Sequence, residues 1–560
     1  MLINFKPILI IIQILIKFII YHKILMIILF YIILGIIATI LAIGVYILVI
    51  YPIIRFSEMR RKYGDKIKVY FSIGKGIFNF YQQDLIKKND SLAFIRSMHH
   101  ENLKAFAFNY GTKVGLSFVE PEHQRQLFQN IHSFSKADGP IAITFLFGHS
   151  IAFAPEKEWR RQRQFLSKSF HFEEIKNYLP LIKQSCEKIV KKLDTKLLQN
   201  DQIEVKVVGI SQEVTSEISY KIFFGSASEN QMKITKKDGT QIPISEEIVQ
   251  IIIDSFTLLK TDKLALIKWI LLKRNSVNYF PTKGEKEILI RLQALKQVQI
   301  DVVTKRNEEL IKDPSQAKKN FLDQYLIEMI QDKNSGITYD EIISNFAAIY
   351  FAGTDTSGNM VGVALYYLSR FPEIQQQARA EIIKVLSSKK EIMKTEFSQL
   401  EFEDIQNLNF IHCILKESLR IMGPSISSQI KQADHNIKIG EFDIKKGDLV
   451  TAHYFYNHTN PSVFENPDDF KPERWLDSNN LKQQSNFSPF SQGPRSCIGQ
   501  HLAIIEGKCL LASILLQFEI IPNTSQQVIR ELKSIYTFQN DNLVFFKKIK
   551  QINQKTEMMI

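Results

Sequence analysis

The stretch Asn486–Ala503, NFSPFSQGPRSCIGQHLA, decides the fold of this 560-residue chain. Gly493 and Gly499 bracket Cys497, and glycines placed in this way can shape a tight loop whose backbone N–H groups point at the sulfur. Residues 500–515 then follow a helical pattern, so the thiol stands just before a helix N-terminus, which favours the thiolate. A thiolate presented in this way is a metal ligand or a nucleophile.

Four cysteines occur in the chain, too few for a disulfide framework at this length. None of them forms a C-x-x-C pair of the zinc or redox type. We therefore expect the bulk of the chain to face a reducing compartment. Cys186, Cys413 and Cys509 lack the loop context of Cys497, and a small buried hydrophobe is the simplest interpretation of a lone cysteine.

The spacing F-x-x-G-x-R-x-C-x-G around the cysteine resembles the haem-ligand loop of the cytochrome P450 family. The residues that meet this spacing are Phe490, Gly493, Arg495, Cys497 and Gly499. The resemblance implies that these residues bind haem b and that Cys497 is the metal ligand. Ser491 departs from the pattern, because a glycine is common directly after the phenylalanine.

A second motif, AGTDTS at residues 352–357, lies inside a helical pattern that opens with a capping box at residues 338–341. Gly353 costs about 1 kcal/mol relative to alanine in a helix, and a threonine hydroxyl can bond a backbone carbonyl, so we expect the helix to bulge here. Alone, the motif would be a flexible point in a buried helix. The resemblance implies that Asp355 and Thr356 are catalytic and deliver protons during the activation of dioxygen.

Glu417 and Arg420 share a helix face, where such pairs are common and contribute only about 0.3 kcal/mol. Arg474 follows in the stretch PERW at residues 472–475. In the family, an arginine at this place joins the helix pair in a buried triad. The resemblance therefore implies that the three residues are structural supports of the cysteine loop and take no part in the chemistry.

Trp159 and Arg163 place an indole and a guanidinium on one face of a predicted helix. In isolation, this is most simply a surface cation–π pair. A planar guanidinium also suits a carboxylate, and haem carries two propionates. The resemblance implies that Trp159, Arg163 and Arg495 contact the propionates. Lys431 stands where many relatives have a further arginine, and a lysine there would lose bidentate pairing.

Helical periodicity dominates the rest of the chain. Predicted helices cover residues 156–170, 173–196, 246–272, 284–311, 338–370, 372–387 and 402–421. Short β patterns occur at residues 66–81, 437–444, 449–456 and 535–547, the first as a hairpin around Gly74 and Gly76. The resemblance spans about residues 63–548. It implies a mainly α fold with small β-sheets, the cytochrome P450 fold, as one haem-thiolate monooxygenase domain at 55–560 behind an N-terminal transmembrane anchor at 1–54.

From Ile24 to Ile54 the chain has no charged residue or histidine for 31 residues. About 20 apolar residues span a bilayer, so this segment is long enough for a membrane anchor. A cleaved signal peptide would have an apolar region of only about 7 to 15 residues. Residues 7–20 are also mainly apolar and suit an interfacial segment, a partly embedded helix or half of a hairpin.

Arg55, Arg60, Arg61 and Lys62 follow the anchor, and by the positive-inside rule they place the remainder on the cytosolic side. A mitochondrial transit peptide would be Arg-rich, whereas the first 54 residues contain no arginine. We expect localisation in the endoplasmic reticulum membrane, with the catalytic domain facing the cytosol.

The resemblance implies insertion of one oxygen atom from O2 into an apolar small molecule, such as a lipid, sterol, terpenoid or xenobiotic. No G-x-G-x-x-G fingerprint occurs, so electrons are expected from NADPH through a separate flavoprotein reductase. With a net charge of +13, basic residues near the thiolate could dock an acidic face of that reductase, and salt-independent electron transfer would contradict this. Solvation and the lipid membrane explain part of the same charge, and no nucleic acid partner is expected.

Candidate substrate contacts are apolar and aromatic stretches at residues 134–149, 346–353, 424–430 and 536–538. Two other functions share this pattern. A haem-thiolate isomerase or dehydratase would need no external dioxygen; Asp355 and Thr356 argue against it, and a rearranged product without NADPH consumption would support it. A non-enzymatic haem sensor would show no spin-state change with any substrate, and the sequence carries no extra recognition segment for that role.

Overall fold

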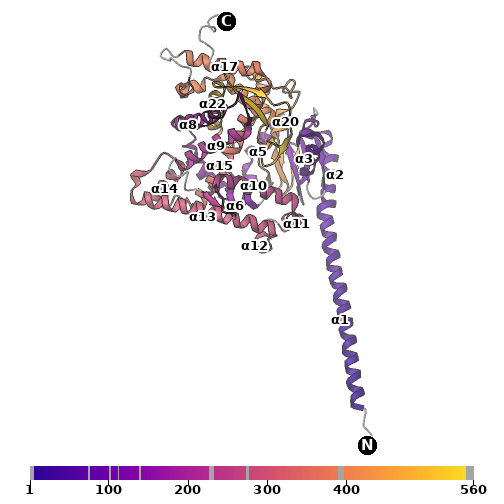
Figure 1. Cartoon of the computed structure of the whole chain (residues 1–560). Helices are drawn as coiled ribbons and strands as arrows, with labels where there is room; N and C mark the ends of the chain where they lie inside the picture. The colour runs from indigo at the N-terminus through magenta and orange to yellow at the C-terminus, as the bar shows by residue number, and fades with distance from the viewer. Residues whose placement is uncertain are drawn as a thin grey trace.

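The computed structural model describes residues 6–72, 76–99, 102–110, 112–137, 141–225, 233–236, 238–272, 276–388, 396–477, 479–540 and 542–549. It shows a mainly helical body from which one long helix, α1, projects with the N-terminus at its far end (Figure 1). The prediction of a mainly helical fold with small β-sheets is confirmed.

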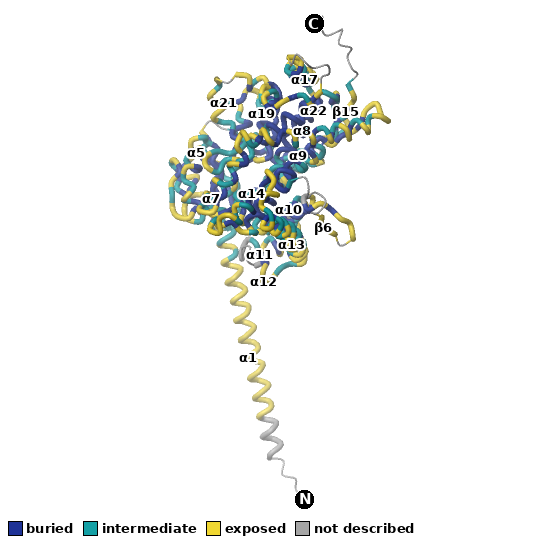
Figure 2. The backbone as a smooth tube through the Cα atoms, turned by 90° about the vertical axis from the view of Figure 1, so that its left-hand side faces the viewer, coloured by how far each residue is buried: buried dark blue, intermediate teal, exposed yellow. Residues whose placement is uncertain are grey.

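Helix α1 (Lys6–Val45) continues through a π-helical turn (Tyr46–Ile50) into α2 (Tyr51–Tyr63) without a break. Most of α1 is exposed, in contrast to the body (Figure 2). At 1.5 Å per residue, its 40 residues make a helix of about 60 Å, twice the hydrocarbon core of a bilayer. By length and composition it can cross a membrane. The hairpin considered for residues 7–20 does not form, because they lie within this one helix.

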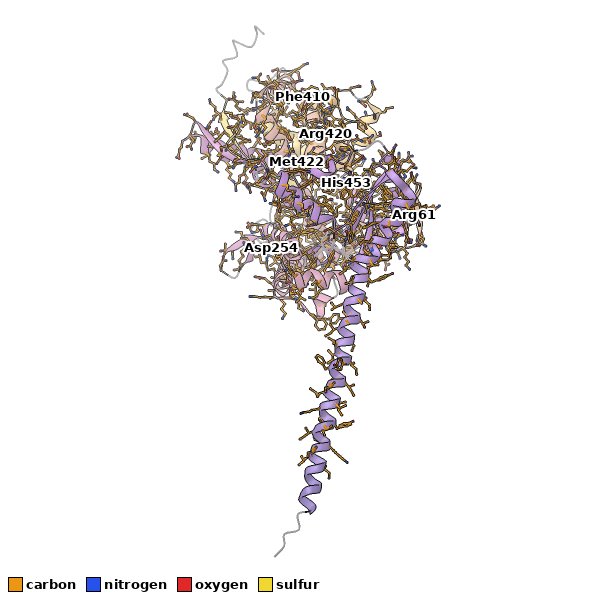
Figure 3. The ribbon with its side chains drawn as sticks, turned by 90° about the vertical axis from the view of Figure 1, so that its right-hand side faces the viewer. Arg61, Asp254, Phe410, Arg420, Met422 and His453 are labelled. Atoms are coloured by element: carbon orange, nitrogen blue, oxygen red, sulfur yellow. The ribbon has the colours of Figure 1, made fainter. Side chains whose placement is uncertain are left out.

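Helix α2 packs onto the body. Three of its side chains join a buried cluster with the main sheet: Phe56, Met59 and Tyr63. Arg55 is also buried, and its Nη2 donates to Asp448 at 2.9 Å. The basic flank expected after the anchor is therefore reduced to the exposed residues 60–62 in the last turn of α2, of which Figure 3 labels Arg61 on the body.

The main sheet has the strand order β1-β2-β3-β11-β8-β4. Its strands are β1 (Ile67–Tyr70), β2 (Ala105–Tyr110), β3 (Lys113–Phe118), β4 (Phe134–Lys136), β8 (Lys431–Ala433) and β11 (Leu449–Ala452). Strand β1 pairs in parallel with β2, and α3 (Ile77–Lys88) follows it, so the hairpin predicted at residues 66–81 is wrong. A Cβ at Gly76 would lie 1.8 Å from the carbonyl oxygen of Asn109, so this glycine allows a close approach to β2. Gly74 lies outside the described residues.

Four smaller sheets also occur in the described chain. They consist of β12 (Phe518–Pro522) with β15 (Leu543–Lys548) and β5 (Gln202–Lys206), β13 (Arg530–Leu532) with β14 (Tyr536–Phe538), β9 (Ile437–Ile439) with β10 (Phe442–Ile444), and β6 (Lys233–Thr235) with β7 (Gln241–Pro243). The β patterns predicted at 437–444 and 535–547 are confirmed. The pattern at 449–456 is only partly correct, because β11 is followed by the short helix α20 (Tyr454–His458).

Five predicted helices are confirmed within a few residues: α7 (Glu156–Ser167), α8 (Phe172–Leu197), α13 (Lys283–Lys312), α17 (Pro372–Ser387) and α22 (Gln500–Leu515). Further helices are α4 (Ala93–Arg96), α5 (Pro121–Gln129), α6 (Ile141–Phe147), α9 (Val207–Phe224), α12 (Ser276–Tyr279), α14 (Phe321–Gln331) and α21 (Leu481–Asn486). Short 3₁₀ turns occur at Gly64–Lys66, Ile131–Ser133, Pro314–Gln316, Phe397–Gln399 and Pro472–Trp475. The helical periodicity therefore located most of the body correctly.

Two predicted helices are each divided, because a carboxylate caps a new N-terminus within the pattern. The first becomes α10 (Ile244–Thr261) and α11 (Lys263–Leu272), and Asp262 accepts the N–H groups of Leu264 and Ala265 at 2.9 and 3.0 Å. The second becomes α18 (Phe402–Gln406) and α19 (Asn409–Met422). There, the carboxylate of Glu381 on α17 accepts the first N–H groups of α19 at 2.7 and 3.0 Å.

The long helix predicted at 338–370 runs through the core as α15 (Tyr339–Phe351), a π-helical segment (Ala352–Thr356) and α16 (Ser357–Arg370). The expected bulge in this helix is therefore present. Of the predicted capping box, only one half forms: Thr338 accepts the N–H of Glu341 at 3.2 Å. The carboxylate of Glu341 instead binds Arg161 on α7, which ties the two helices together.

Candidate active site

The cysteine loop joins α21 to α22 and is closed by its own backbone. The N–H of Cys497 donates to the carbonyl of Phe490 at 2.9 Å, and the N–H of Ser496 donates to that of Gly493 at 3.0 Å. Gly493 has a φ of 73°, and a Cβ there would lie 2.9 Å from the Cβ of Phe128. Only glycine suits this position. As expected, Cys497 is exposed and the other three cysteines are buried.

Ser491, the departure from the family pattern, has a φ of 65°. A left-handed backbone costs a non-glycine residue about 1 to 2 kcal/mol. The hydroxyl of Tyr454 lies 2.7 Å from Ser491 Oγ, and the Ser491 N–H donates to Ser488 at 3.1 Å. These two bonds, which a glycine could make only in part, hold the loop in the conformation that the family pattern assigns to glycine.

The thiol of Cys497 differs in one respect from the sequence expectation. Although accessible, it is surrounded by a large mass of protein, and this desolvation raises its pKa above the usual value. The N–H of Gly499 and the charge of Arg163 act in the opposite direction. The helix N-terminus therefore does not by itself favour the thiolate in the protein, and a cation bound at the sulfur would supply the missing stabilisation.

Trp159, Arg163 and Arg495 come together beside this loop. The guanidinium of Arg495 lies over the Trp159 ring, with 4.5 Å between the Arg495 Cζ and the ring centroid, and it donates to the carbonyl of Ala154 at 3.3 Å. Arg163 Nη1 donates to the carbonyl of Ser496 at 2.8 Å. Trp159 is buried, which excludes the surface cation–π pair considered above. Arg163 thus fastens α7 to the residue next to Cys497.

Lys431 lies in the same region and has a neighbour that the sequence did not single out. In the register of β4 and β8, Lys431 is directly opposite Lys136. Like charges at opposite positions are destabilising. Burial, followed by the charge of Arg495, lowers the pKa of Lys431 to about 8, and the pKa of Lys136 is also lowered by burial and by the two other cations.

Among the described residues, no carboxylate forms an ion pair with Lys136, Lys431 or Arg495. Their partners are neutral: the side chain of Gln429, the carbonyl of Ala154 and aromatic rings. Three buried or half-buried cations without an ion-pair partner among the described residues fit a dianionic ligand, and haem has two propionates. The donor set of one accessible thiol and three such cations therefore suits haem. Lys136 could have been found only from the pairing of β4 with β8.

The π-helical segment places the hydroxyl of Thr356 close to the backbone. Thr356 Oγ1 donates to the carbonyl of Ala352 at 2.5 Å, so the hydrogen bond expected from a threonine hydroxyl to a backbone carbonyl is present. Thr215 Oγ1 on α9 donates to the carbonyl of Thr354 at 3.0 Å, which satisfies a second carbonyl freed by the bulge. The segment is thus a defined irregularity rather than only a flexible point.

Glycines on this long helix allow α9 to approach closely. A Cβ at Gly353 would lie 2.5 Å from Ser219 Oγ, and one at Gly358 would lie 2.9 Å from the backbone of Gln212. The approach brings Gln212 Nε2 to 3.2 Å from Asp355 Oδ1. The missing side chains of these glycines therefore determine which residue of α9 contacts Asp355.

Asp355 is buried, and desolvation raises its pKa to about 7. A carboxyl group with this pKa is present in both protonation states near neutral pH, as a proton relay requires. The same shift links its protonation to stability. The unfolded chain loses this proton near pH 4 and the folded chain near pH 7, so the folded state loses relative stability as the pH rises between these values.

We expect Asp355→Asn, which imitates the neutral acid, to become more stable than the wild type as the pH rises from 4 to 7. The gain should reach about 2 to 4 kcal/mol and stay constant above pH 7. Urea unfolding at a series of pH values measures it. The matched control is Asp340→Asn, at a half-exposed position on α15. If the difference in free energy of unfolding between Asp355→Asn and the wild type did not change with pH, the raised pKa of Asp355 would be contradicted.

The triad predicted from Glu417, Arg420 and Arg474 forms in the interior, and Figure 3 shows Arg420 within the helical body. Arg420 and Glu417 are completely buried. Arg420 donates to both carboxylate oxygens at 2.8 and 2.9 Å, and Arg474 Nε donates at 3.0 Å. Trp475 Nε1 adds a further bond to this carboxylate at 2.9 Å, a partner that the motif contained but the sequence analysis did not assign. The surface ion pair is therefore excluded.

The four stretches proposed as substrate contacts lie side by side, and the N–H of Ala137 in the first donates to the carbonyl of Ile430 in the third at 3.2 Å. The ring of Phe147 on α6 packs on Phe351 of α15, with 5.8 Å between centroids. The N–H of Tyr536 donates to Pro424 at 3.0 Å, which joins the two remaining stretches. Tyr536 itself is buried and donates to Asp90 at 2.6 Å, so it supports this region from inside. Residues 138–140 of the first stretch lie outside the described residues.

Fold and site together fit an enzyme that binds haem beside a loop with one accessible cysteine. The family model for cytochrome P450 matches residues 74–544, and the chain belongs to the cytochrome P450 family. It is therefore a haem-b-dependent monooxygenase, an oxidoreductase.

Individual relatives agree with this assignment. The chain is 27% identical over 426 residues to a 7-deoxyloganic acid hydroxylase from Catharanthus roseus, covering 73% of this chain and 75% of that protein. It is 24% identical over 455 residues to a probable cytochrome P450 4s3 from Drosophila melanogaster, covering 79% and 85%. The crystal structure of the cytochrome P450DA haem domain matches with a TM-score of 0.65 at 17% identity, covering 85% of this chain and 93% of that one.

Proposed function

We propose that this enzyme inserts one oxygen atom into an apolar small molecule with electrons from NADPH, passed on by a separate flavoprotein reductase. The balanced reaction is RH + O2 + NADPH + H⁺ → ROH + H2O + NADP⁺. The observation that carries the proposal is the geometry of the closed loop, which presents one accessible cysteine beside a cluster of cations. The apolar lining supports a lipid, sterol, terpenoid or xenobiotic as the substrate class.

Cys497 is proposed as the iron ligand, held by the loop from Phe490 to Gly499. Trp159, Arg163, Arg495 and Lys431, with Lys136, would bind the haem and its propionates. Haem with a thiolate ligand supplies the cleavage of the O–O bond when it is bound. Arg163 donates to the carbonyl next to Cys497, so it also orients the sulfur.

Asp355 and Thr356 are proposed to move protons. At rest, the Thr356 hydroxyl proton is held by the carbonyl of Ala352. When this bond opens, the hydroxyl can donate its proton toward the reacting oxygen and receive another. Asp355, with a pKa of about 7, can release a proton and regain one from solvent at neutral pH. The reaction consumes protons, so a replenished donor is needed in every turnover.

The reductase is proposed to approach α7, which adjoins the cysteine loop. The exposed residues Lys157 on this helix and Lys168 directly after it are basic, and Arg160, also exposed, binds Glu156 of the same helix. Exposed basic residues complement an acidic partner. Residues 1–54 are proposed as an anchor in the endoplasmic reticulum membrane with residues 55–560 in the cytosol, which is supported by the exposed apolar helix α1 and the exposed basic residues at 60–62.

The test is the absorption spectrum of the purified protein, reduced with dithionite and exposed to carbon monoxide. A strongly red-shifted Soret band is expected, because thiolate ligation changes the electronic structure of the haem. A band typical of histidine or neutral thiol ligation would overturn the catalytic roles. NADPH oxidation with a reductase and candidate apolar substrates then tests turnover.

Thr356→Ala should keep the haem and the spectrum, but NADPH oxidation should no longer be coupled to product formation. Without the hydroxyl, proton delivery slows, and we expect product per NADPH to fall about tenfold, with the electrons appearing as hydrogen peroxide. Product and peroxide are measured together in the reconstituted system. Thr356→Ser keeps the hydroxyl and should retain most of the coupling. An unchanged product yield in Thr356→Ala would show that the relay assignment is wrong.

A further inference from the structure

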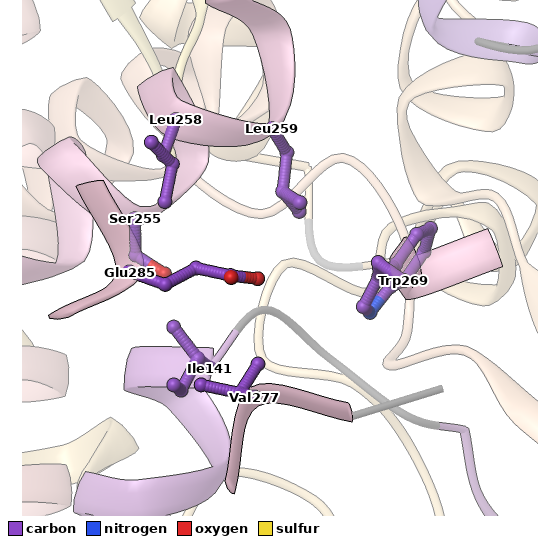
Figure 4. Close-up of a pocket in the computed structure, with 7 residues that line it drawn as sticks. All are labelled: Ile141, Ser255, Leu258, Leu259, Trp269, Val277 and Glu285. Carbon is purple, nitrogen blue, oxygen red and sulfur yellow. The ribbon is translucent and has the colours of Figure 1, made fainter. Parts of the chain in front are cut away.

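A small cavity lies between helices α6, α10, α11, α12 and α13, and no residue of the cysteine loop lines it (Figure 4). Its lining residues are Ile141, Ser255, Leu258, Leu259, Trp269, Val277 and Glu285. Its volume is about 20 Å³, which is room for one water molecule or one functional group of that size.

Two polar groups face each other in this mainly apolar lining. The carboxylate of Glu285 points across the cavity toward Trp269 (Figure 4). The indole Nε1–H of Trp269 is buried and has no hydrogen-bond acceptor in the part of the chain that is described. An unsatisfied buried donor costs about 1 to 3 kcal/mol. An oxygen atom bound in the cavity would remove this cost.

The charge of the cavity selects among oxygen-bearing groups. Glu285 Oε2 accepts from Lys268 Nζ at 2.6 Å and from the N–H of Thr282 at 2.6 Å, so the one cation beside the cavity is already paired with this carboxylate. An anionic ligand would meet the carboxylate without a free cation, and a hydrocarbon would leave the indole N–H unpaired. A hydroxyl group matches both sides, because it accepts from Trp269 and donates to Glu285.

The cavity is connected to the proposed reaction site by helix α6. Ile141, its first residue, lines the cavity, and Phe147, its last, packs on Phe351 directly before the π-helical segment. A helix of 7 residues is about 10 Å long. A molecule that extended along α6 from its hydroxyl in the cavity would bring a carbon about 10 Å away toward the segment of Thr356.

We propose that this cavity binds the hydroxyl group of an elongated, uncharged apolar alcohol, and that Trp269 and Glu285 recognise it. The proposal rests on the proposed function, since it names the substrate class of the monooxygenase. It places the oxidised carbon at the end of the molecule remote from the existing hydroxyl. Trp269 is then a specificity-determining residue.

Fluorine NMR of the full-length haem protein in detergent, labelled with 5-fluorotryptophan, tests the proposal. The chain has 3 tryptophans, so the Trp269 signal is assigned as the one missing in Trp269→Phe. The probes are cyclohexanol, methoxycyclohexane and methylcyclohexane. The ether can accept from Trp269 but cannot donate to Glu285, and the hydrocarbon can do neither.

We expect cyclohexanol to shift the Trp269 signal and to bind about five- to tenfold more tightly than the ether, the effect of one hydrogen bond. Methylcyclohexane should leave the signal in place. Tyr279→Phe, which removes an exposed hydroxyl from α12, is the matched control and should respond like the wild type. An equal response to all three probes, or no response to any because the cavity holds water only, would overturn the proposal.

The carbon monoxide spectrum of the same sample separates the two hypotheses. A red-shifted Soret band without a selective response to the alcohol leaves the proposed function intact and removes the alcohol site. A selective response without the red-shifted band supports the site and refutes the haem-thiolate function on which its role in catalysis depends.

Discussion

Cys497→Ser is expected to abolish the red-shifted Soret band of the reduced carbon monoxide complex and to lower activity to below about 1% of the wild type. A hydroxyl is a far weaker donor to iron than a thiolate, so the electronic effect that drives O–O cleavage is lost. The loop itself should persist, because its closing bonds join the backbones of residues 490–497 and do not involve the sulfur. The absorption spectrum and product formation with a reductase are the measurements.

The control for this variant is Cys413→Ala. Cys413 is buried in a cluster with Phe464 and Trp475 and lies on α19. Its replacement should cost about 1 kcal/mol of stability and leave the Soret band unchanged. If Cys497→Ser retained the red-shifted band, another residue would have to be the ligand, and the functional assignment of the whole loop would be withdrawn.

Glu417→Ala is expected to lower the free energy of unfolding by at least about 3 to 5 kcal/mol. The variant leaves Arg420 as a buried cation with no carboxylate and removes the acceptor of Arg474 and Trp475. A loss of this size is a large part of the stability of most domains. We expect poor recovery of folded protein and loss of haem, measured by urea unfolding and by the Soret absorbance per protein.

Glu473→Gln provides the comparison for this variant. Glu473 is exposed in the same PERW stretch, so its change should stay within about 0.5 kcal/mol. Glu417→Gln keeps the shape of the side chain and removes only its charge. Its loss of unfolding free energy should lie between those of Glu417→Ala and Glu473→Gln. Normal stability and haem content in Glu417→Ala would show that the triad is not the support of the cysteine loop.

The parts of the site that the sequence revealed are those coded by short motifs. The loop around Cys497, the bulge at Thr356 and the bond to its backbone carbonyl follow from local chemistry of glycine and hydroxyl groups. The meeting of Glu417 with Arg474 came from the family resemblance, because the isolated pair pattern is common on helix surfaces. The site roles of these residues remain predictions that the variants above will test.

The features that could not be predicted from the sequence depend on contacts between distant parts of the chain. Lys136 is opposite Lys431 only because β4 pairs with β8, and a sequence motif contains no register of this kind. The sequence pattern around Arg55 shows a free positive charge, whereas Asp448 holds this residue in the interior. The sequence after Gly76 predicts a strand although it forms a helix, because aromatic residues occur in both and the sequence does not show the tertiary partner.

The unbroken passage from α1 into α2 has a consequence for how the enzyme meets its partners. If the link between anchor and body were flexible, the body could rotate about three axes. An electron donor would then meet the face that accepts electrons in only a few of its collisions. With α1 in a bilayer, the pairing of Arg55 with Asp448 and the continuous helix keep the body from turning independently of the anchor. A donor confined to the same membrane would then meet fewer orientations of the body, so productive collisions become more frequent without any increase in binding strength.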